Sequence, residues 1–425
     1  MKEKIIKFLK KFNIFDIFIM SGGMAIAQIV TILAQPIATR IYTPEQFGVF
    51  TLVLQFATMF SACACLQYEI TIITAPDEKE ANQTTALCFY ILLFTTLVFL
   101  ISAFVYNLFA SGNSQFNGAL LYISALFFFL IGFQSIITTY NKRCGEYKII
   151  SSISVYRSLL HTSLKLLLGW IKTGSFGLIF SAVFSYTGGL KKQAGSIIKN
   201  RKEIFSTKFK DLKRLIKKNI AQPLFHMPGM FISSYSYTVI PIYLTSLYGN
   251  LTDVGFYSQT TAILDLPLVV IGNNISTVFL TNATRERNET GSYRHSLRKA
   301  VLLLAAVAIP SFLAIYFFAP WAFSFFFGEQ WIRSGYFAKI MCPWYFIRFT
   351  ATSIDCTLII EKKQNVALIL RSFMLVLSVA IYFVCRNFAL PVEQFLNITS
   401  ISFALFYLVI IGLVYKYALR SKKTA

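Results

Sequence analysis

Twelve long apolar stretches limit what this chain can fold into. A helix that crosses a membrane needs roughly 20 mostly apolar residues. The stretches cover residues 14–35, 47–67, 84–110, 117–139, 150–170, 174–190, 220–247, 254–281, 299–325, 335–360, 364–385 and 396–416. Charged residues make up only 14% of the chain, which is far below their share in soluble proteins. We therefore expect an all-α integral membrane protein with twelve transmembrane helices.

Basic residues fall almost entirely on one side of these predicted spans. If the N-terminus and every second connection share a side, that side carries 31 Lys and Arg and the other side carries 4. The positive-inside rule places the richer side, and with it both termini, in the cytoplasm. The same rule accounts for the net charge of +22. We expect no nucleic-acid partner, because the aromatic residues lie in apolar runs and not between basic residues.

Histidine and cysteine give no sign of a metal site. The three histidines, His161, His226 and His295, are widely separated. Six of the seven cysteines lie inside apolar stretches, and none has the spacing of zinc ligands. We therefore expect the cysteines to be inert packing residues, and we expect no bound metal.

A basic loop divides the chain into two halves. Residues 191–219 form the predicted cytoplasmic loop, between a six-helix lobe at 1–190 and another at 220–425. The loop is either a solvated surface attracted to anionic lipid headgroups or a site for a specific partner. The pattern Phe47-Gly48 returns 207 residues later around Gly255-Phe256. We therefore predict two pseudo-symmetric lobes that face a central cleft.

The first hydrophobic hairpin contains small and polar residues where a lipid-facing helix would carry Leu or Ile. Its conspicuous residues are Ser21, Gly22, Gln28, Pro36, Arg40, Tyr42, Pro44, Phe47, Gly48, Tyr68 and Glu69, followed by an acidic stretch at 77–81. With these residues the hairpin resembles the polysaccharide transporters. That family includes the O-antigen flippases and belongs to the multidrug/oligosaccharidyl-lipid/polysaccharide exporter superfamily.

The resemblance implies a function in the bacterial inner membrane. A flippase of this kind moves an undecaprenyl-pyrophosphate-linked oligosaccharide, a unit of O-antigen lipopolysaccharide or of another surface polysaccharide, to the outer leaflet by alternating access. Nothing is chemically altered, so we expect a transporter and not an enzyme, without a cofactor. Proton or sodium coupling stays open. The expected partners are the lipid-linked oligosaccharide and the bilayer, with other polysaccharide assembly proteins as further candidates.

Three basic residues share one face of the fifth predicted span. Arg157, His161 and Lys165 recur at every fourth position, within about 80° around the helix axis. Charges inside a membrane are costly and usually face a wet cleft or one another. We interpret the three as a ladder for an anionic substrate. The alternative is that they extend to the nearest membrane surface.

The second half holds four further charges within predicted spans. We expect Asp355 and Arg371 to form a structural pair, which leaves Arg348 to meet the substrate. Asp265 lies two residues before Pro267, in the middle of a span. It is either a proton or sodium site or the partner of a cation in the cleft, and both interpretations stay open.

Two other functions compete with flipping. A cation-coupled multidrug exporter of the same superfamily would need a more acidic cleft than the basic ladder provides. A membrane glycosyltransferase such as an O-antigen polymerase usually has a large outer loop, and the outer connections here are all short.

The charge distribution predicts a definite topology. A reporter fused after Gly249 should be extracytoplasmic, and one fused after Lys202 should be cytoplasmic. Paired alkaline phosphatase and green fluorescent protein fusions measure both positions. Finding the two positions on the same side would contradict the twelve-span arrangement.

Overall fold

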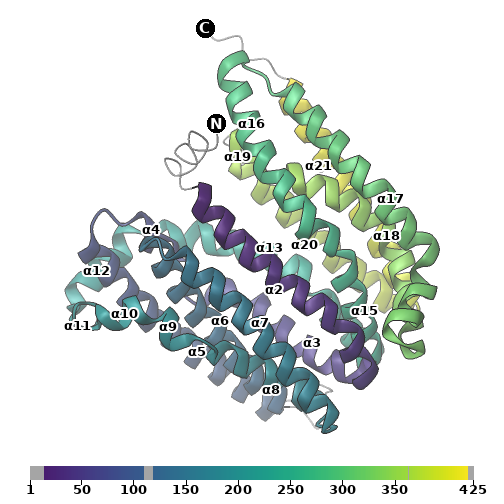
Figure 1. Ribbon diagram of the computed structural model, residues 1–425, viewed down its shortest axis with the longest axis horizontal. Helices are drawn as coiled ribbons and strands as arrows, with labels where there is room; N and C mark the ends of the chain where they lie inside the picture. Colours follow the sequence, from purple (N-terminus) through teal and green to yellow (C-terminus); the bar gives the residue numbers. More distant parts are fainter. Residues whose placement is uncertain (1–13, 110–117, 362, 420–425) are drawn as a thin grey trace. The chain divides into compact units, whose positions relative to one another are not determined.

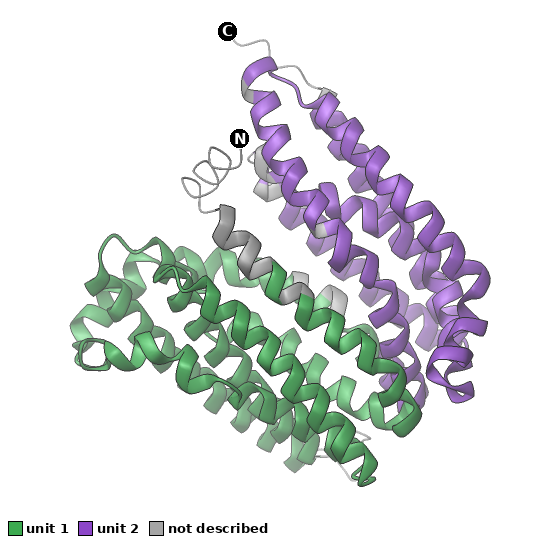
Figure 2. Cartoon of the chain, in the orientation of Figure 1, with its two compact units in different colours: residues 1–242 green, residues 243–425 purple. Residues whose placement is uncertain are grey.

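The computed structural model describes residues 14–109, 118–361 and 363–419, and every regular element in those ranges is a helix (Figure 1). The chain divides into two compact units, residues 1–242 and 243–425 (Figure 2). The elements of unit 1 are α2 (Ile14–Ile41), α3 (Pro44–Met59), η1 (Ser61–Cys63), α4 (Ile70–Thr74), α5 (Glu78–Phe109), α6 (Gly118–Arg143), α7 (Tyr147–Trp170), α8 (Ser175–Thr187), α9 (Leu190–Gln193), α10 (Gly195–Lys199), α11 (Arg201–Phe205), α12 (Phe209–Lys218), η2 (Gln222–His226) and α13 (Met227–Thr238). Helix α14 (Ile240–Tyr248) joins the units. Unit 2 continues with α15 (Leu251–Leu264), η3 (Leu268–Gly272), α16 (Asn273–Thr290), α17 (Arg294–Phe327), η4 (Glu329–Trp331), α18 (Ile332–Ile354), α19 (Thr357–Ile360), α20 (Gln364–Asn387) and α21 (Val392–Leu419).

The protein is a multi-pass membrane protein. Within the described residues, seven helical segments are long and apolar enough to cross a bilayer. They are Pro44–Cys63, Glu78–Phe109, Gly118–Arg143, Leu251–Arg287, Arg294–Phe327, Val366–Asn387 and Val392–Ala418. All twelve predicted stretches coincide with helical segments, but the number of transmembrane helices, twelve, stays a prediction.

Four of the predicted stretches, 47–67, 220–247, 254–281 and 335–360, are not single α-helices, and two of these breaks have a clear local cause or mark. In the second predicted stretch, residues 47–67, the α-helix α3 ends at Met59. Further along, Leu66 and Gln67 have positive φ angles of 51° and 64°. The eighth stretch breaks between α15 and the π-helical turn η3, next to Pro267. Proline lacks the backbone N–H that a regular helix needs at such a position.

The turn between α2 and α3 is set by local chemistry. The Thr43 side chain accepts a hydrogen bond from the Gln46 backbone N–H, and the Gln46 side chain accepts one from the Thr43 N–H. This reciprocal arrangement is a capping box, and Pro44 occupies the first helical position, where its missing N–H costs nothing. The sequence at 43–46 therefore starts α3 without help from the rest of the fold.

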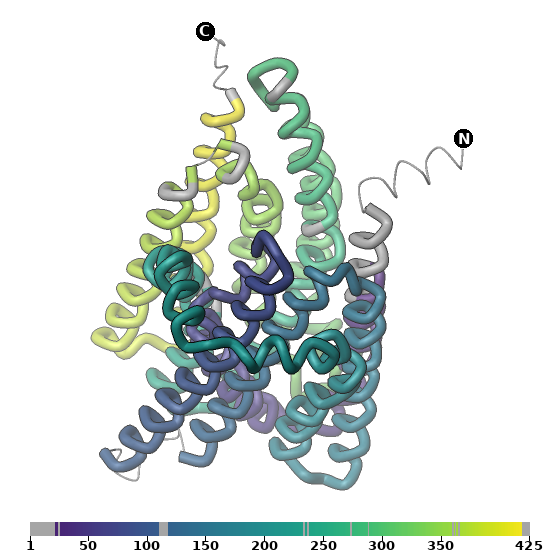
Figure 3. The backbone as a smooth tube through the Cα atoms, turned by 90° about the vertical axis from the view of Figure 1, so that its left-hand side faces the viewer, coloured from purple at the N-terminus to yellow at the C-terminus, as the bar shows by residue number. Residues whose placement is uncertain are grey.

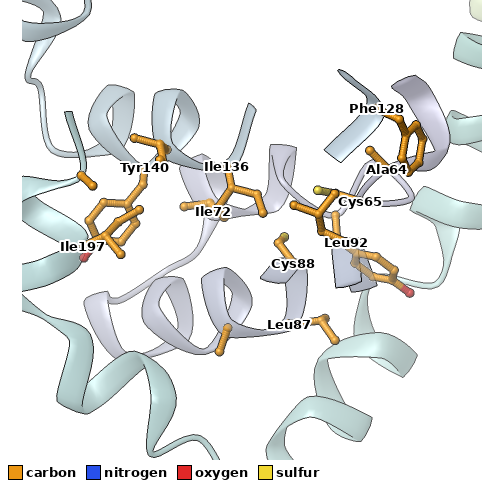
Figure 4. Packing of buried hydrophobic residues seen from close by; sticks show 14 of the residues in the cluster. Ala64, Cys65, Ile72, Leu87, Cys88, Leu92, Phe128, Ile136, Tyr140 and Ile197 are labelled. Atoms are coloured by element: carbon orange, nitrogen blue, oxygen red, sulfur yellow. The ribbon is translucent and has the colours of Figure 1, made fainter. Parts of the chain in front are cut away.

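The predicted basic loop folds into short helices that pack on unit 1. Helices α9 to α12 bury Ile197, Ile204, Leu212 and Leu215 in the apolar core formed by α3 to α6. Figure 4 shows Ile197 beside Tyr140 of α6 in this core. Figure 3 shows the segment, in teal, running across the helices of unit 1. Its inner face is therefore part of the core, which corrects the expectation of a wholly solvated loop.

Helix boundaries repeat along the chain at nearly constant spacing. Helices α3 and α15 begin 207 residues apart, at Pro44 and Leu251. Helices α7 and α20 have 24 residues each and begin 217 residues apart. The packing also recurs, since α6 packs on α3, α5 and α8 as α18 packs on α15, α17 and α21. These correspondences support the predicted internal repeat.

A close helix contact in unit 2 provides a test of the packing. A Cβ added to Gly335 of α18 would lie 2.5 Å from the Pro320 Cα of α17. We expect Gly335→Ala to destabilise the protein by about 1–3 kcal/mol, since the backbone of α17 cannot yield easily. Gly412→Ala is the matched control, because its Cβ would meet nothing within 4 Å. Thermal unfolding in detergent measures both, and equal effects would contradict the close contact.

Candidate functional site

Helices α2 and α7 of unit 1 are joined by polar side chains. The Ser158 hydroxyl donates to the Ala27 carbonyl at 2.6 Å and lies 3.0 Å from the Thr31 hydroxyl. Thr31 in turn bonds its own helix through the Ala27 carbonyl at 3.0 Å. Small and hydroxylated residues allow membrane helices to approach closely and hydrogen-bond across their interface. The predicted basic residues of α7 therefore lie on a helix that is firmly held against α2.

Lys165 is the most deeply buried of the three predicted basic residues. It is 4% exposed, and its ammonium group donates to the Gln35 amide oxygen of α2 at 3.3 Å. Its own carbonyl accepts a hydrogen bond from the Tyr42 hydroxyl at 2.7 Å. Among the described residues, no carboxylate oxygen lies within 4.0 Å of the Lys165 ammonium, the distance that defines an ion pair. A buried ammonium with only a neutral side-chain partner is energetically costly, so this position has the character of a functional site.

The motif residue Tyr42 shapes the interface at the C-terminal end of α2. Its ring fits a slot left by two glycines, because a Cβ at Gly169 or Gly177 would lie 2.7 Å from Tyr42 ring or hydroxyl atoms. Phe47 closes the slot with an edge-to-face contact at 6.1 Å between ring centroids. The motif therefore positions Tyr42, which in turn holds the backbone of α7 at Lys165.

His161 lies one turn from Lys165 on α7. Its Nε2 is buried and has no hydrogen-bond partner among the described residues. His161 and Lys165 thus share a part of α7 in which neither has an ion-pair partner among the described residues.

Arg157 behaves differently from the other two. Its guanidinium donates to the carbonyls of Gly188 and Tyr186, at 3.1 and 2.9 Å, and lies 5.9 Å from the Tyr186 ring centroid. These contacts cap the C-terminal end of α8. In this conformation Arg157 is bonded to the protein's own backbone, so only His161 and Lys165 of the predicted ladder are left to meet an anionic substrate.

The charged site of unit 2 differs from the predicted one. Arg348 donates to the Asp265 carboxylate at 2.9 Å and lies 4.9 Å from the Tyr345 ring centroid. Arg348 was expected to be free, and the structure corrects this. Among the described side chains, Asp355 and Arg371 form no ion pair within 4.0 Å, although the charge of Arg371 still acts on Asp355. Asp265 directly follows the last residue of α15, next to the break at Pro267, and sequence spacing does not reveal that it meets α18.

The remaining motif residues serve mostly as structure. Tyr68 donates to the Ile216 carbonyl at 3.3 Å, and Glu69 is buried, with its Oε2 lacking a hydrogen-bond partner among the described residues. Gly48 is buried, Gln28 and Pro36 are half-buried, and Gly22 and Arg40 are exposed. The side chain of Ser21 lies outside the described residues.

Two contributors escaped the sequence analysis. Gln35 stands directly before Pro36 in α2, and only the folded structure shows that it meets Lys165. Arg143 donates to the carbonyls of Ile72, Ile73 and Ala75 and so holds the end of α4. A polar residue next to a proline in an apolar helix is the sequence signal that could have singled out Gln35.

A groove in unit 2 is separate from these charges. It has a volume of about 730 Å³ and lies between α16 and α17, with Asn282, Arg285, Glu289 and Lys299 among its lining residues. Glu286 in its wall accepts hydrogen bonds from the His295 and Ser296 N–H groups, which caps α17. No cluster of metal-ligating side chains occurs among the described residues.

Comparison with known proteins confirms the resemblance that the first hairpin indicated. The family described as polysaccharide biosynthesis protein matches residues 37–335. A search of curated proteins gave no match.

Several solved structures share the fold. The lipid II flippase MurJ, in an inward closed conformation, has a TM-score of 0.69 and 14% identity, covering 95% of this chain and 90% of its own. An inward-facing multidrug resistance transporter of the MATE family has a TM-score of 0.63 and 15% identity, over 92% and 93% of the two chains. A MOP-superfamily transporter from Pyrococcus furiosus, described as having a binding pocket of reverse polarity, has a TM-score of 0.55 and 15% identity, over 96% of each chain.

The ion pair of unit 2 predicts a pattern of stability. Asp265→Ala should cost about 1–3 kcal/mol, because the Arg348 side chain is only 14% exposed and loses its carboxylate. Adding Arg348→Met should restore part of that loss by removing the uncompensated charge. Thermal unfolding of purified protein measures the effect.

Asp355→Ala is the control for this pair. It should cost less than Asp265→Ala, since Asp355 has no ion-pair partner within 4.0 Å among the described side chains. A larger loss for Asp355→Ala would reinstate the pairing expected from the sequence.

Proposed function

The chain belongs to the family of polysaccharide biosynthesis proteins, and we propose that it is a flippase for a lipid-linked oligosaccharide. The proposed substrate is an undecaprenyl-pyrophosphate-linked unit of O-antigen or of a related surface polysaccharide. The proposed location is the bacterial inner membrane, with both termini in the cytoplasm. The reaction is translocation without chemical change, so the protein is proposed not to be an enzyme.

The observation that carries the proposal is the buried basic pair of unit 1. Lys165 is 4% exposed and bonded to the neutral Gln35, and His161 one turn away has a buried ring nitrogen without a partner among the described residues. A site of this kind is prepared for negative charge. The pyrophosphate of a lipid-linked sugar brings that charge, and its entry would compensate the buried ammonium.

The mechanism follows from what holds Lys165 in place. In this conformation the Gln35 amide oxygen accepts a hydrogen bond from the Lys165 ammonium, and the surrounding helices bury that side chain away from water. In the proposed cycle, unit 1 opens toward the substrate and the anionic headgroup replaces Gln35 as the partner of the Lys165 ammonium. When the headgroup leaves, Gln35 bonds to Lys165 again. Turnover requires that the headgroup both bind and leave, and the returning Gln35 amide favours its release by taking up the Lys165 hydrogen bond again. The lipid tail stays in the surrounding hydrocarbon.

The ionic groups of unit 2 have a more limited proposed role. Asp265 is engaged by Arg348, so this observation favours the cation-partner interpretation over a proton or sodium site. Arg348 then contributes to substrate binding only if that pair opens. Coupling to an ion stays a prediction without an assigned residue.

A multidrug exporter is the second candidate, because a MATE-family transporter shares the fold. Cationic drugs need carboxylates to bind them in a membrane cleft. The buried basic pair of unit 1 disfavours such a cargo, and the ion pair at Asp265 already neutralises that carboxylate.

The proposal predicts that charge at position 165 matters more than bulk. Lys165→Gln should lower transport at least tenfold, whereas Lys165→Arg should keep a substantial share, because an anion in a low-dielectric site needs a compensating positive charge. The assay measures movement of a fluorescent polyprenyl-pyrophosphate-linked glycan in proteoliposomes. Surface polysaccharide in cells, normalised to membrane protein level, is the second readout.

Lys148→Gln is the matched control, since Lys148 is an exposed lysine at the beginning of the same helix. It should transport at the wild-type rate. Normal transport by a Lys165→Gln and His161→Gln double variant would overturn the role of the pair. Transport of cationic drugs in place of the glycan would favour the exporter.

A further inference from the structure

The helices α9 to α12 form a continuous surface that we call the basic belt, residues 190–218. It contains eleven Lys and Arg and only two acidic residues, Glu203 and Asp211. The inner face of the belt is fixed by the apolar core of unit 1. Its outer face takes no part in the proposed transport site, so its composition calls for a separate explanation.

Polar contacts fasten the belt to the ends of two candidate membrane spans. Asn82 of α5 donates to the Glu203 carboxylate at 2.8 Å and accepts from the Tyr140 hydroxyl of α6 at 2.8 Å. Asn200 donates to that same hydroxyl at 2.7 Å. Lys218 forms an ion pair with Glu80 at the start of α5. These contacts, with the Tyr140–Asn82 bond buried beneath the belt, give it a fixed position on unit 1.

The attachment points show where the belt lies. Asn82 is four residues after the start of the apolar helix Glu78–Phe109, and Tyr140 is three residues before the end of Gly118–Arg143. Both helices are long and apolar enough to cross a membrane, and their apolar stretches, 84–110 and 117–139, begin and end next to Asn82 and Tyr140, which puts these two residues at the boundary between hydrocarbon and headgroups. The belt therefore lies at the level of the lipid headgroups.

Helix α12 has three distinct faces. Leu212 and Leu215 point into the core. At 100° per residue, Phe209 and Ile216 share a neighbouring face, and they are 81% and 37% exposed. Beside them lie the exposed lysines 210, 213 and 217.

An apolar stripe bordered by lysines is typical of a helix that lies in the plane of a membrane surface. The aromatic ring would enter the acyl boundary while the ammonium groups meet the headgroups. Phe205 of α11 adds a further exposed ring, at 55%. A merely solvated charged helix would not be expected to expose large apolar side chains in register with its lysines.

We infer that the basic belt is a docking surface for anionic phospholipid headgroups. The charge balance of the belt selects anionic over zwitterionic lipids, because each basic residue near such a surface contributes roughly 1 kcal/mol of attraction. The exposed rings supply the apolar part of the contact. A bilayer containing phosphatidylglycerol is the partner that meets both requirements at this depth. The function of the belt is independent of which substrate the protein carries.

The test uses the full-length protein in detergent. Fluorescent phosphatidylglycerol is titrated against wild type and against a variant with Lys210→Gln, Lys213→Gln and Lys217→Gln. The affinity should fall about tenfold or more in the variant, and phosphatidylcholine should bind weakly to both. The matched control removes three exposed charges elsewhere, with Lys148→Gln, Arg298→Gln and Lys416→Gln, and should bind like wild type.

A second measurement reads the depth of the belt directly. A spin label at Phe209→Cys, with the exposed Cys144 changed to Ser, should be accessible to oxygen and shielded from a water-soluble nickel complex in phosphatidylglycerol-containing proteoliposomes. Equal phosphatidylglycerol affinity of the two triple variants would overturn the inference. So would full exposure of the label to nickel, or tighter binding of a single-stranded oligonucleotide than of the lipid.

Discussion

A charge inside hydrocarbon has to find its partner within the protein, and much of this structure follows from that requirement. Arg348 meets Asp265, and Arg157 meets two backbone carbonyls at the end of α8. At the start of α18, just outside the predicted spans, Arg333 bridges Asp253 and Glu393 in the same way. Each of these cations stabilises a contact between helices. Lys165 is different, because among the described residues its ammonium has one side-chain partner, the Gln35 amide at 3.3 Å, whereas Arg157 is held by two carbonyls and lies over the Tyr186 ring.

That difference separates structural charges from a functional one. A cation paired with a carboxylate gains nothing from a passing anion. A buried ammonium held by an amide remains available to a stronger acceptor. The same argument explains why a flippase of anionic lipid-linked sugars fits unit 1 better than an exporter of cationic compounds.

Close helix packing holds this arrangement in place. Tyr42 can bond the Lys165 carbonyl only because Gly169 and Gly177 leave space for its ring. In unit 2 the absence of a side chain at Gly335 lets α18 approach the backbone of α17. On the other side of unit 1, the basic belt buries its leucines and isoleucines while it keeps its lysines outward. The belt therefore belongs both to the core and to the membrane surface.

The sequence by itself determined the membrane class, the helical segments, the start of α3 and the family. These features depend on local composition or on neighbours within a few residues, such as the Thr43 capping box. It also showed which residues are charged within apolar helices, including Lys165, Arg348 and Asp265. The charge pattern could not say which of them meet, because pairing depends on helix rotation and on breaks such as the one at Pro267.

Only the tertiary structure decided the partners. It joined Arg348 to Asp265 and left Asp355 and Arg371 without an ion pair among the described side chains. It also brought Gln35 to Lys165 across 130 residues of sequence. A rotation of one helix by a single residue, about 100°, moves a side chain to another face. Long-range packing fixes that rotation, and for this reason the identity of each partner could not be obtained from spacing along the chain.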